Sequence, residues 1–440
     1  MTAGPSMEGL MSEPLENLVR LTEPEFFMAY PYDVYARLRT AAPVYWSERD
    51  RTWALSRYED IRFVSMSPHL FASRFGLAAS QARAEDDGMP ETPDPVDGLS
   101  MPRAAALRYE SSMMMGGEQL VGSDPPRHAF LRKIASHAFT PRAVSALEDE
   151  VARLAVELID RIEPDVELDF IDAVAAPVPM MVIARMLGVS TDDLDDFRRW
   201  SDSFIELNEE HPDRSEAEVL EYIGSVMEFR EYFAAELEER QTRPRDDLLT
   251  ALTQAVDDDG ERLDPQSQLA MAQIFLIAGN ETTRGLLANA GKLLFDHADQ
   301  RNLLADEPGR IPNAIEELLR YQPPVTHMCR TALTDVELRG QQLRRGDYMI
   351  LLYPAANRDE EVWEEPDRLD VTRVPDPSHL AFGFAEHFCL GAALARREAR
   401  LVLGELLRRY PNYEILDDDP VRVRAHMTPG IKRMPTIFAS

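Results

Sequence analysis

The feature that most constrains this chain is a long helical pattern at residues 265–296. Asp264 and Pro265 supply an N-cap and a first-turn proline. Apolar residues then recur at helical spacing, namely Leu269, Ile274, Ile277, Leu286, Leu287 and Leu293. A helix of about thirty residues is unusually long for a globular protein. We therefore expect much of it to be buried, with the rest of the chain packed around it.

Most of the other patterned segments are helical as well. Their spacing and their boundaries predict helices near residues 31–40, 58–65, 126–138, 141–163, 173–188, 192–205, 215–240, 245–255, 311–321 and 390–409. Strand patterns are shorter and predict a hairpin at 44–46 and 53–55, β-like runs at 335–338, 341–344 and 348–353, and an irregular loop at 357–388. The predicted fold class is mainly α with a small β part.

Residues 76–118 break this regularity. The stretch from Ala84 to Pro102 carries four prolines and six acidic residues and shows little periodicity. Long loops in compact domains are either functional or unstructured. We therefore interpret 76–118 as a loop insertion, in part disordered, with a lid over a pocket as the alternative.

Composition limits the partners of the chain. Its 440 residues carry a net charge of −31, which disfavours nucleic acid and anionic membranes. No linker divides the sequence, so we expect one domain over residues 1–440. Met1 to Glu23 contains no apolar run long enough for a signal peptide or a membrane span, and two cysteines make no disulfide framework. These features predict a soluble, cytoplasmic protein, and we expect a monomer.

The chemistry is concentrated in the segment from Phe382 to Gly391. Cys389 ends a loop directly before a predicted helix. Unpaired amides and the helix dipole at such a position favour the thiolate, which is the form that binds iron. The second cysteine, Cys329, has no glycine-rich loop and no following helix, and we interpret it as a core or pocket-wall residue.

This segment resembles the haem-binding loop of the cytochrome P-450 superfamily, with Ala385 where the family has a glycine. An alanine costs a little there if the position needs a positive φ. The resemblance implies a cytochrome P-450-like fold and non-covalent haem b between the long helix and the loop, with Cys389 as the iron ligand; residues 76–118 are atypical of the family. The other implied cofactor-binding residues are Phe382, Gly383, His387 and Gly391 in the loop and Tyr353 upstream.

The long helix carries a second family motif. The small residues Ala278 and Gly279 would let a flat macrocycle and dioxygen approach the backbone. Glu281 and Thr282 resemble the acid–alcohol pair of the family. The resemblance implies that Thr282 hydrogen-bonds the bound oxygen and that Glu281 links it to solvent, so that the two residues deliver protons.

A third motif lies after Asp124. His128 and Arg132 share one helical face at i, i+4, so they can hold one carboxylate together. In the family these positions, together with one matching Arg330, contact a haem propionate.

Glu317 and Arg320 form a Glu-x-x-Arg pattern at i, i+3 on a predicted helix. Read alone, the pattern is a surface pair. The resemblance implies a buried structural cluster completed by Arg368, because buried carboxylate and guanidinium groups need mutual pairing.

The implied function is a monooxygenase that hydroxylates C–H bonds of a lipophilic small molecule such as a fatty acid, terpenoid or steroid. The chain has no flavin or nicotinamide fingerprint and no iron–sulfur cysteines, so we expect a separate ferredoxin or flavodoxin with its reductase. A basic dock for such an acidic partner would comprise Arg127, Lys133, Arg142, Arg396 and Arg397. The predicted substrate pocket comprises Ile274, Ile277, Ala278, Val325, His327 and Met328, with the turn at 428–430.

Two other functions stay open at this point. A peroxide-driven haem enzyme would typically lack the Glu281–Thr282 pair. A non-catalytic haem or gas-sensing protein would need no route for protons at all. The Glu281–Thr282 pair therefore favours the monooxygenase.

Overall fold

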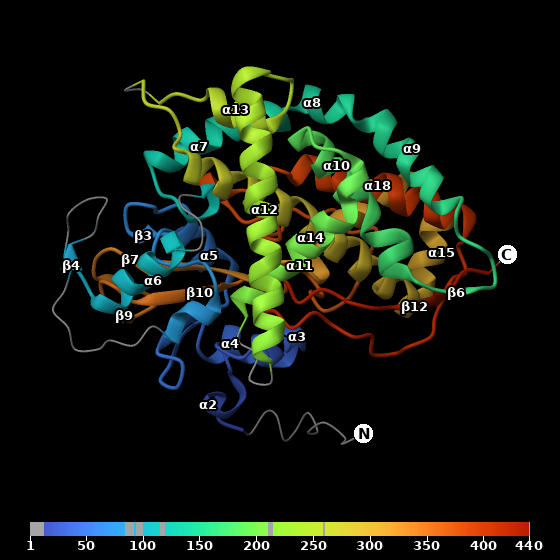
Figure 1. The fold of residues 1–440 in the computed structure, drawn as a ribbon. Helices are drawn as coiled ribbons and strands as arrows, with labels where there is room; N and C mark the ends of the chain where they lie inside the picture. Colours follow the sequence, from blue (N-terminus) through green and yellow to red (C-terminus); the bar gives the residue numbers. More distant parts are fainter. Residues whose placement is uncertain are drawn as a thin grey trace.

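The computed structural model describes residues 13–83, 92–93, 100–114, 119–209, 214–257 and 260–439. Helices form most of the molecule, and the larger sheet lies to one side of them (Figure 1). The fold class predicted from the sequence, mainly α with a small β part, is confirmed. The expectation of one domain over 1–440 stays a prediction.

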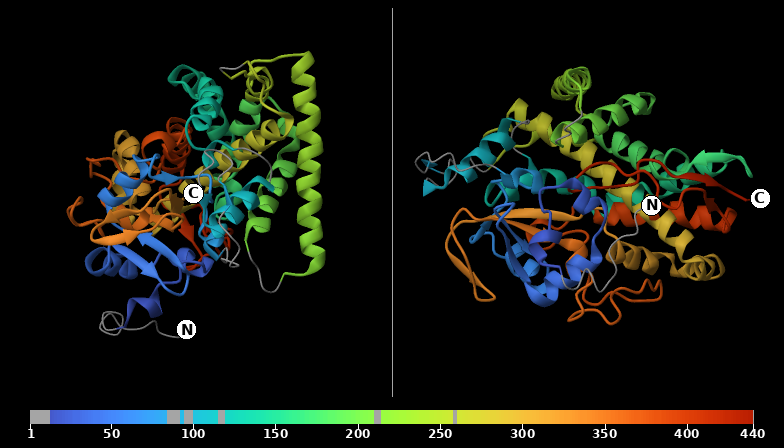
Figure 2. Two further views of the ribbon diagram at one scale, coloured as in Figure 1. Left: turned by 90° about the vertical axis from the view of Figure 1, so that its left-hand side faces the viewer. Right: turned by 90° about the horizontal axis from the view of Figure 1, so that it is seen from below.

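The long central helix is α14 (Pro265–Asp296), with the bounds that the sequence predicts. The Asp264 side chain caps it by accepting a hydrogen bond of 3.0 Å from the Ser267 N–H. It crosses the middle of the molecule (Figure 2, right) and packs against α10, α11, α12, α13, α16 and α18. Tertiary packing therefore stabilises a helix whose middle contains glycine and threonines.

The remaining helices surround α14. The N-terminal ones are α2 (Leu15–Leu18), α3 (Pro24–Met28), α4 (Tyr32–Ala41) and α5 (Tyr58–Ser65). The middle ones are α7 (Arg127–Ser136), α8 (Pro141–Ala146), α9 (Glu148–Ile159), the π-helix η4 (Ile171–Ala175), α10 (Pro177–Leu187), α11 (Leu194–Asn208), α12 (Glu216–Thr242) and α13 (Leu248–Gln254). The C-terminal ones are α15 (Ala298–Asp306), α16 (Ile311–Tyr321), α17 (Tyr353–Ala356) and α18 (Ala392–Arg409).

The larger sheet has the strand order β1-β2-β10-β7-β3. Its strands are β1 (Val44–Ser47), β2 (Thr52–Leu55), β3 (Phe71–Ala72), β7 (His327–Ala332) and β10 (Tyr348–Leu352). The predicted hairpin is confirmed, with Val44 opposite Leu55. Strand β7 was not predicted, although it pairs with β10 over its whole length but one residue and carries four of the residues discussed below.

Three small sheets complete the β part. A three-stranded one joins β11 (Glu414–Ile415), β12 (Pro435–Ile437) and β6 (Glu167–Asp169). The two-stranded ones pair β8 (Val336–Leu338) with β9 (Gln341–Leu343), and β4 (Thr92–Pro93) with β5 (Ser100–Met101).

The prediction of a loop over residues 76–118 is wrong for two helical parts of it, besides the short strands β4 and β5. Residues 79–83 form a 3-10 helix, η1, and 103–114 form the helix α6. Alanine, leucine, arginine and methionine dominate α6, and these residues favour helix. The buried Arg108 fixes it, donating hydrogen bonds of 2.9 Å to the Phe75 carbonyl and 3.2 Å to the Gly346 carbonyl. Most of the proline-rich acidic stretch lies outside the described residues.

Among the described residues, no helix is both long and apolar enough to span a membrane. The same part of the chain contains no group of three or more histidine, cysteine or acidic side chains placed to hold a metal ion. Both cysteines are free thiols.

Candidate active site

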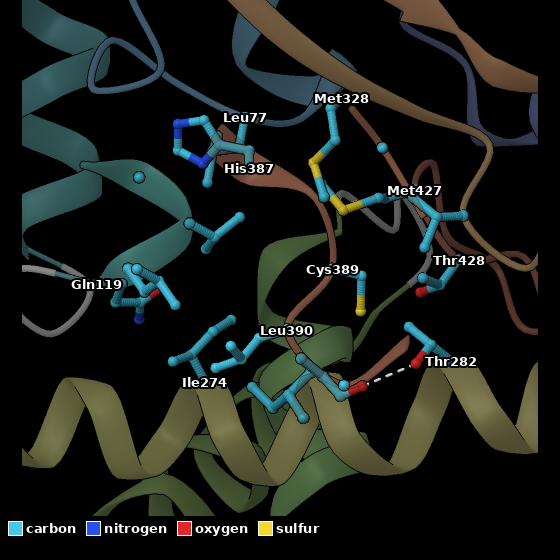
Figure 3. A pocket seen from close by; sticks show the side chains of 18 of the residues that line it. Leu77, Gln119, Ile274, Thr282, Met328, His387, Cys389, Leu390, Met427 and Thr428 are labelled. Carbon is cyan, nitrogen blue, oxygen red and sulfur yellow. Dashed lines mark hydrogen bonds between the residues drawn. The ribbon is translucent and has the colours of Figure 1, made fainter. Parts of the chain in front are cut away.

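A cavity of about 910 Å³ lies between α14 and the loop that carries Cys389. In Figure 3 the Cys389 sulfur points from this loop into the cavity, and Ile274 and Thr282 line the opposite side from α14. The cavity is large enough for a drug-sized ligand. It brings together two segments more than a hundred residues apart in the sequence.

Hydrogen bonds within the Cys389 loop set its shape. The Cys389 N–H donates to the Phe382 carbonyl at 2.8 Å, and the Phe388 N–H donates to the Ala385 carbonyl at 3.0 Å. These bonds fold the segment into a tight turn, which ends where α18 begins at Ala392. The loop thereby presents one sulfur at the start of a helix, as the sequence predicts.

Two residues of the loop adopt positive φ angles. Gly383 has φ +69 and Ala385 has φ +57. Residue 385 is where the family has glycine, and the left-handed conformation explains that preference because it carries no penalty for a residue without Cβ. The alanine is accommodated with some backbone strain.

Two opposing effects act on the Cys389 thiol, which faces the cavity. Burial raises the pKa of the Cys389 thiol above its ordinary value, although a hydrogen bond from the Gly391 backbone N–H lowers it in part. The amides at the helix start favour the thiolate, as predicted, and the enclosure of the site opposes them. A bound metal ion is what would deprotonate such a thiol.

Cationic and imidazole side chains gather at one edge of the cavity. His128 and Arg132 come from α7, Arg330 from β7 and His387 from the Cys389 loop, and all four line the cavity. The two imidazole rings lie 4.3 Å apart. His128 is 2% exposed, and its Nε2 has no hydrogen-bonding partner in the described structure. Buried polar atoms are rarely left unpaired, so this edge suits an anionic ligand such as a haem propionate.

Burial and the neighbouring cations both act on the two imidazoles of this edge. Burial and the neighbouring Arg132 lower the pKa of His128 to about 4. Burial, Arg330 and His128 lower the pKa of His387 to about 2. A carboxylate among these groups would reverse much of this effect, because an opposite charge favours the protonated imidazole.

Gly279 lines the cavity, as predicted, and its missing side chain also serves the packing of two helices. A Cβ at Gly279 would lie 2.9 Å from two side-chain atoms of Ile183, so the missing side chain lets α10 approach α14. Ala278 and Thr282 line the cavity, as predicted. The Thr282 hydroxyl donates a hydrogen bond of 2.7 Å to the Ala278 carbonyl, drawn in Figure 3.

Glu281 belongs to a short chain of charges that runs from the cavity to the surface. Its carboxylate accepts a hydrogen bond of 2.6 Å from Arg284, and Arg284 lies 3.5 Å from Asp202 of α11, whose side chain is 46% exposed. Burial raises the pKa of Glu281, and Arg284 opposes that effect. The arrangement places a buried carboxyl group beside Thr282, within reach of a solvated partner.

The buried Glu317–Arg320 pair is present, but the prediction that Arg368 completes it is wrong. Arg320 donates hydrogen bonds of 2.7 and 2.8 Å to Glu317, and both side chains are fully buried. Arg373 supplies the third cation, 3.3 Å from Glu317. The Arg368 side chain is 59% exposed and pairs with Glu365, and only its carbonyl accepts from Arg320.

His327 does not line the cavity, which corrects another prediction. Side chains alternate across a strand, so Met328 faces the cavity while His327 and Cys329 face the core behind it. The His327 Nε2 accepts a hydrogen bond of 3.1 Å from the Ala79 N–H, and its ring lies 4.4 Å from that of Phe27. Burial lowers the pKa of His327 to about 3. The other predicted pocket residues, Ile274, Ile277, Ala278 and Val325, line the cavity.

Sequence reasoning missed several residues that line the cavity. Leu107 and Tyr109 come from α6, inside the segment predicted to be a loop, and Glu398 comes from α18, the helix that follows the Cys389 loop. The helix propensity of 103–114 could have revealed the first two. Glu398 is 2% exposed and its Oε2 has no partner in the described structure, so burial raises its pKa to about 8.

Comparison with known proteins identifies the class. The sequence model of the Cytochrome P450 family matches residues 311–428. A Steroid C26-monooxygenase of Mycobacterium tuberculosis is 36% identical over 383 residues, which cover 86% of this chain and 92% of that protein. A Vitamin D(3) 25-hydroxylase of Pseudonocardia autotrophica is 34% identical, with 93% and 94% covered. The crystal structure of CYP109E1 from Bacillus megaterium with corticosterone has a TM-score of 0.76 at 30% identity, with 93% and 98% covered.

The fold and these relatives define a haem protein of the monooxygenase class. This chain belongs to the cytochrome P450 family, and it is a cytochrome P450 monooxygenase. The resemblance drawn from the Cys389 segment is thereby confirmed at the level of the family, whereas the roles of single residues are proposals.

Proposed function

We propose that Cys389 is the iron ligand of a non-covalent haem b in this cavity and that the enzyme hydroxylates a C–H bond of a lipophilic small molecule. The observation that carries the proposal is the Cys389 sulfur, which faces a large cavity bounded on its other side by α14 (Figure 3). Neither cysteine is in a disulfide, which supports a reducing compartment such as the cytoplasm.

The residues present fit a haem. His128, Arg132 and Arg330 would hold a propionate, and the loop residues Phe382, Gly383, His387 and Gly391 would enclose the sulfur side, with Tyr353 nearby. When bound through a thiolate, haem supplies the activation of dioxygen and the oxidation of the C–H bond. The protein supplies the ligand, the pocket and the protons.

Thr282 and Glu281 are the proposed route for protons. The Thr282 hydroxyl lies at the cavity wall, and the buried Glu281 carboxyl reaches the surface through Arg284 and Asp202. A positioned carboxyl group can take up a proton and pass it on. The route distinguishes an oxygen-using enzyme from a haem sensor, which needs none.

The proposal of a lipophilic substrate rests on the lining and on the relatives. Ile274, Ile277, Val325 and Met328 present apolar side chains to the cavity. The relatives include a steroid monooxygenase, a vitamin D hydroxylase and a Linalool 8-monooxygenase of Pseudomonas putida. Steroids and terpenoids are therefore the first compounds to test.

Electrons would come from a separate ferredoxin or flavodoxin with its reductase. The basic surface predicted to bind this donor changes, because two of its arginines already pair with glutamates of this chain. Arg396 forms two hydrogen bonds to Glu316, of 2.6 and 2.8 Å, and Arg397 pairs with Glu148. Lys133 and Arg142 are exposed, so charge-reversal variants of these two residues are the first to test for binding of the electron donor.

The decisive experiment measures haem binding and turnover together. Reduced protein under carbon monoxide should show the strongly red-shifted Soret band of a thiolate ligand. Steroid and terpenoid panels should then yield hydroxylated product with NAD(P)H and surrogate redox proteins. Product from hydrogen peroxide alone, with none from the reductase system, would instead indicate a peroxide-driven enzyme.

Replacing Thr282 with alanine tests the proton route. We expect product formed per dioxygen consumed to fall by about tenfold or more, because positioned proton transfer contributes about 10²- to 10⁴-fold to a rate. Oxygen uptake and product are measured in the same assay. Thr283→Ala is the matched control, and equal coupling in the wild type and the Thr282 variant would contradict the route.

A further inference from the structure

Two glutamine side chains line the cavity without a hydrogen-bonding partner in the described structure. Gln273 lies on α14 and is only 6% exposed. Gln119 precedes the 3-10 helix η2 (Leu120–Gly122), and only its backbone carbonyl is engaged, by the Ser123 hydroxyl at 2.7 Å and the Gly122 N–H at 3.2 Å. Neither side-chain amide takes part in any interaction with another described residue.

Both glutamines belong to the Ile274 end of the cavity. Gln273 precedes Ile274 on α14, and Figure 3 shows Gln119 on the Ile274 side, away from Cys389 and Thr282. Residues 273 and 282 are nine positions apart, so at 1.5 Å per residue the two ends are separated by about 13 Å along the helix. A ligand that reaches both ends must therefore be elongated.

Several other polar groups of the cavity wall already have partners, and the unpaired His128 Nε2 belongs to the cationic edge described above. Arg74 and Asp124 form an ion pair of 2.9 Å, Glu281 binds Arg284, and Glu209 binds His426 at 2.5 Å. A buried carboxamide without a partner is costly. It is also neutral, and it both donates and accepts hydrogen bonds. Its complement is a hydroxyl or carbonyl group, because a charged group would be buried without a counter-ion.

We infer that Gln273 and Gln119 form the polar anchor of the substrate. The substrate is then an elongated lipophilic molecule with a neutral hydroxyl or carbonyl group at one end. That group binds the two amides, and the C–H bond to be oxidised lies about 13 Å away, at the Thr282 end. The inference rests on the proposed function and adds the chemical class and the orientation of the substrate.

The test compares three probes that share one carbon chain: dodecane, dodecanol and dodecanoate. Their dissociation constants are measured from the Soret shift of the haem-loaded enzyme. Dodecanol should bind at least tenfold more tightly than either of the others. Gln273→Leu should remove about tenfold of that preference, as expected for one lost hydrogen bond, and it should not weaken the binding of dodecane.

Gln266→Leu is the matched control, because this exposed residue lies on the same helix outside the cavity and should leave all three constants unchanged. Gln119→Leu tests the second amide independently should the Gln273 variant fail to fold. Equal binding of dodecane and dodecanol would overturn the inference. The inference would also be overturned if dodecanoate bound most tightly and Gln273→Leu did not change its binding, since a cation would then be the anchor. Loss of the thiolate spectrum in the wild type would instead reject the proposed function.

Discussion

The two cysteines of this chain lie in environments that differ in almost every respect. Cys389 ends an irregular loop, and its sulfur faces the cavity and accepts a hydrogen bond from the Gly391 backbone N–H. Cys329 lies in the middle of β7, fully buried between regular neighbours in the sheet. Burial raises the pKa of the Cys329 thiol to about 12. The comparison shows that the reactivity of a thiol depends on access and on the free amides around it, and a strand interior offers neither.

The largest expected effect is the loss of the iron ligand. Cys389→Ser should abolish the red-shifted ferrous–carbonyl band, because an alcohol does not replace a thiolate on iron. Cys329→Ser should retain the band and lower only the melting temperature, since it buries a hydroxyl in the core. Carbon monoxide difference spectra of both variants decide this. A band that survives in the Cys389 variant would reverse the assignment of the two cysteines.

The next effect concerns the support of the segment before the Cys389 loop. Arg320 donates to Glu317 and to the carbonyls of Asn357 and Pro366. Arg320→Ala should lower the free energy of unfolding by about 3–5 kcal/mol, because it leaves a buried carboxylate unpaired. Arg368→Ala should change it by less than about 0.5 kcal/mol. Urea titrations of both variants measure the difference, and equal effects would restore Arg368 to the cluster.

Glu398 should make the free energy of unfolding depend on pH. Its folded pKa of about 8 lies above the ordinary value of 4.5, so the folded state binds the proton more tightly than the unfolded state. Its contribution to stability is complete below about pH 4.5 and is lost as the pH rises toward 8. Glu398→Gln should therefore stabilise the protein by about 2 kcal/mol at alkaline pH and have little effect in acid. Unfolding free energies at both extremes test this, and a gain that is independent of pH would contradict it.

The smallest effect is expected at Ala385. Its φ of +57 is a conformation in which glycine carries no steric penalty. Ala385→Gly should raise the free energy of unfolding of the haem-loaded protein by at most about 1 kcal/mol, because relief of strain is partly offset by the flexibility of glycine in the unfolded chain. Thermal melts in parallel with Ala381→Gly, at a buried position without a positive φ, provide the contrast. A loss of stability at residue 385 equal to that at 381 would show that the backbone there is unstrained.

Much of the C-terminal half could be predicted from local pattern. The bounds of α14 and α16 match their predictions, because caps, prolines and apolar spacing act within one helix. Family resemblance likewise located the Cys389 loop and the residues of the cavity edge. The same reasoning failed for α6, since its neighbours in sequence are rich in proline while its stabilising contacts come from Phe75 and Gly346.

The sequence by itself determined the class of fold, the long helix and the cysteine that lies before a helix. Each of these depends on the spacing and the type of residues within a short segment. Only the tertiary structure decided which side of β7 faces the cavity, which arginine joins Glu317, and how far burial offsets the dipole at Cys389. These outcomes depend on side chains that meet across distances of tens to hundreds of residues. No local pattern encodes such contacts, and desolvation can be assessed only once they are made.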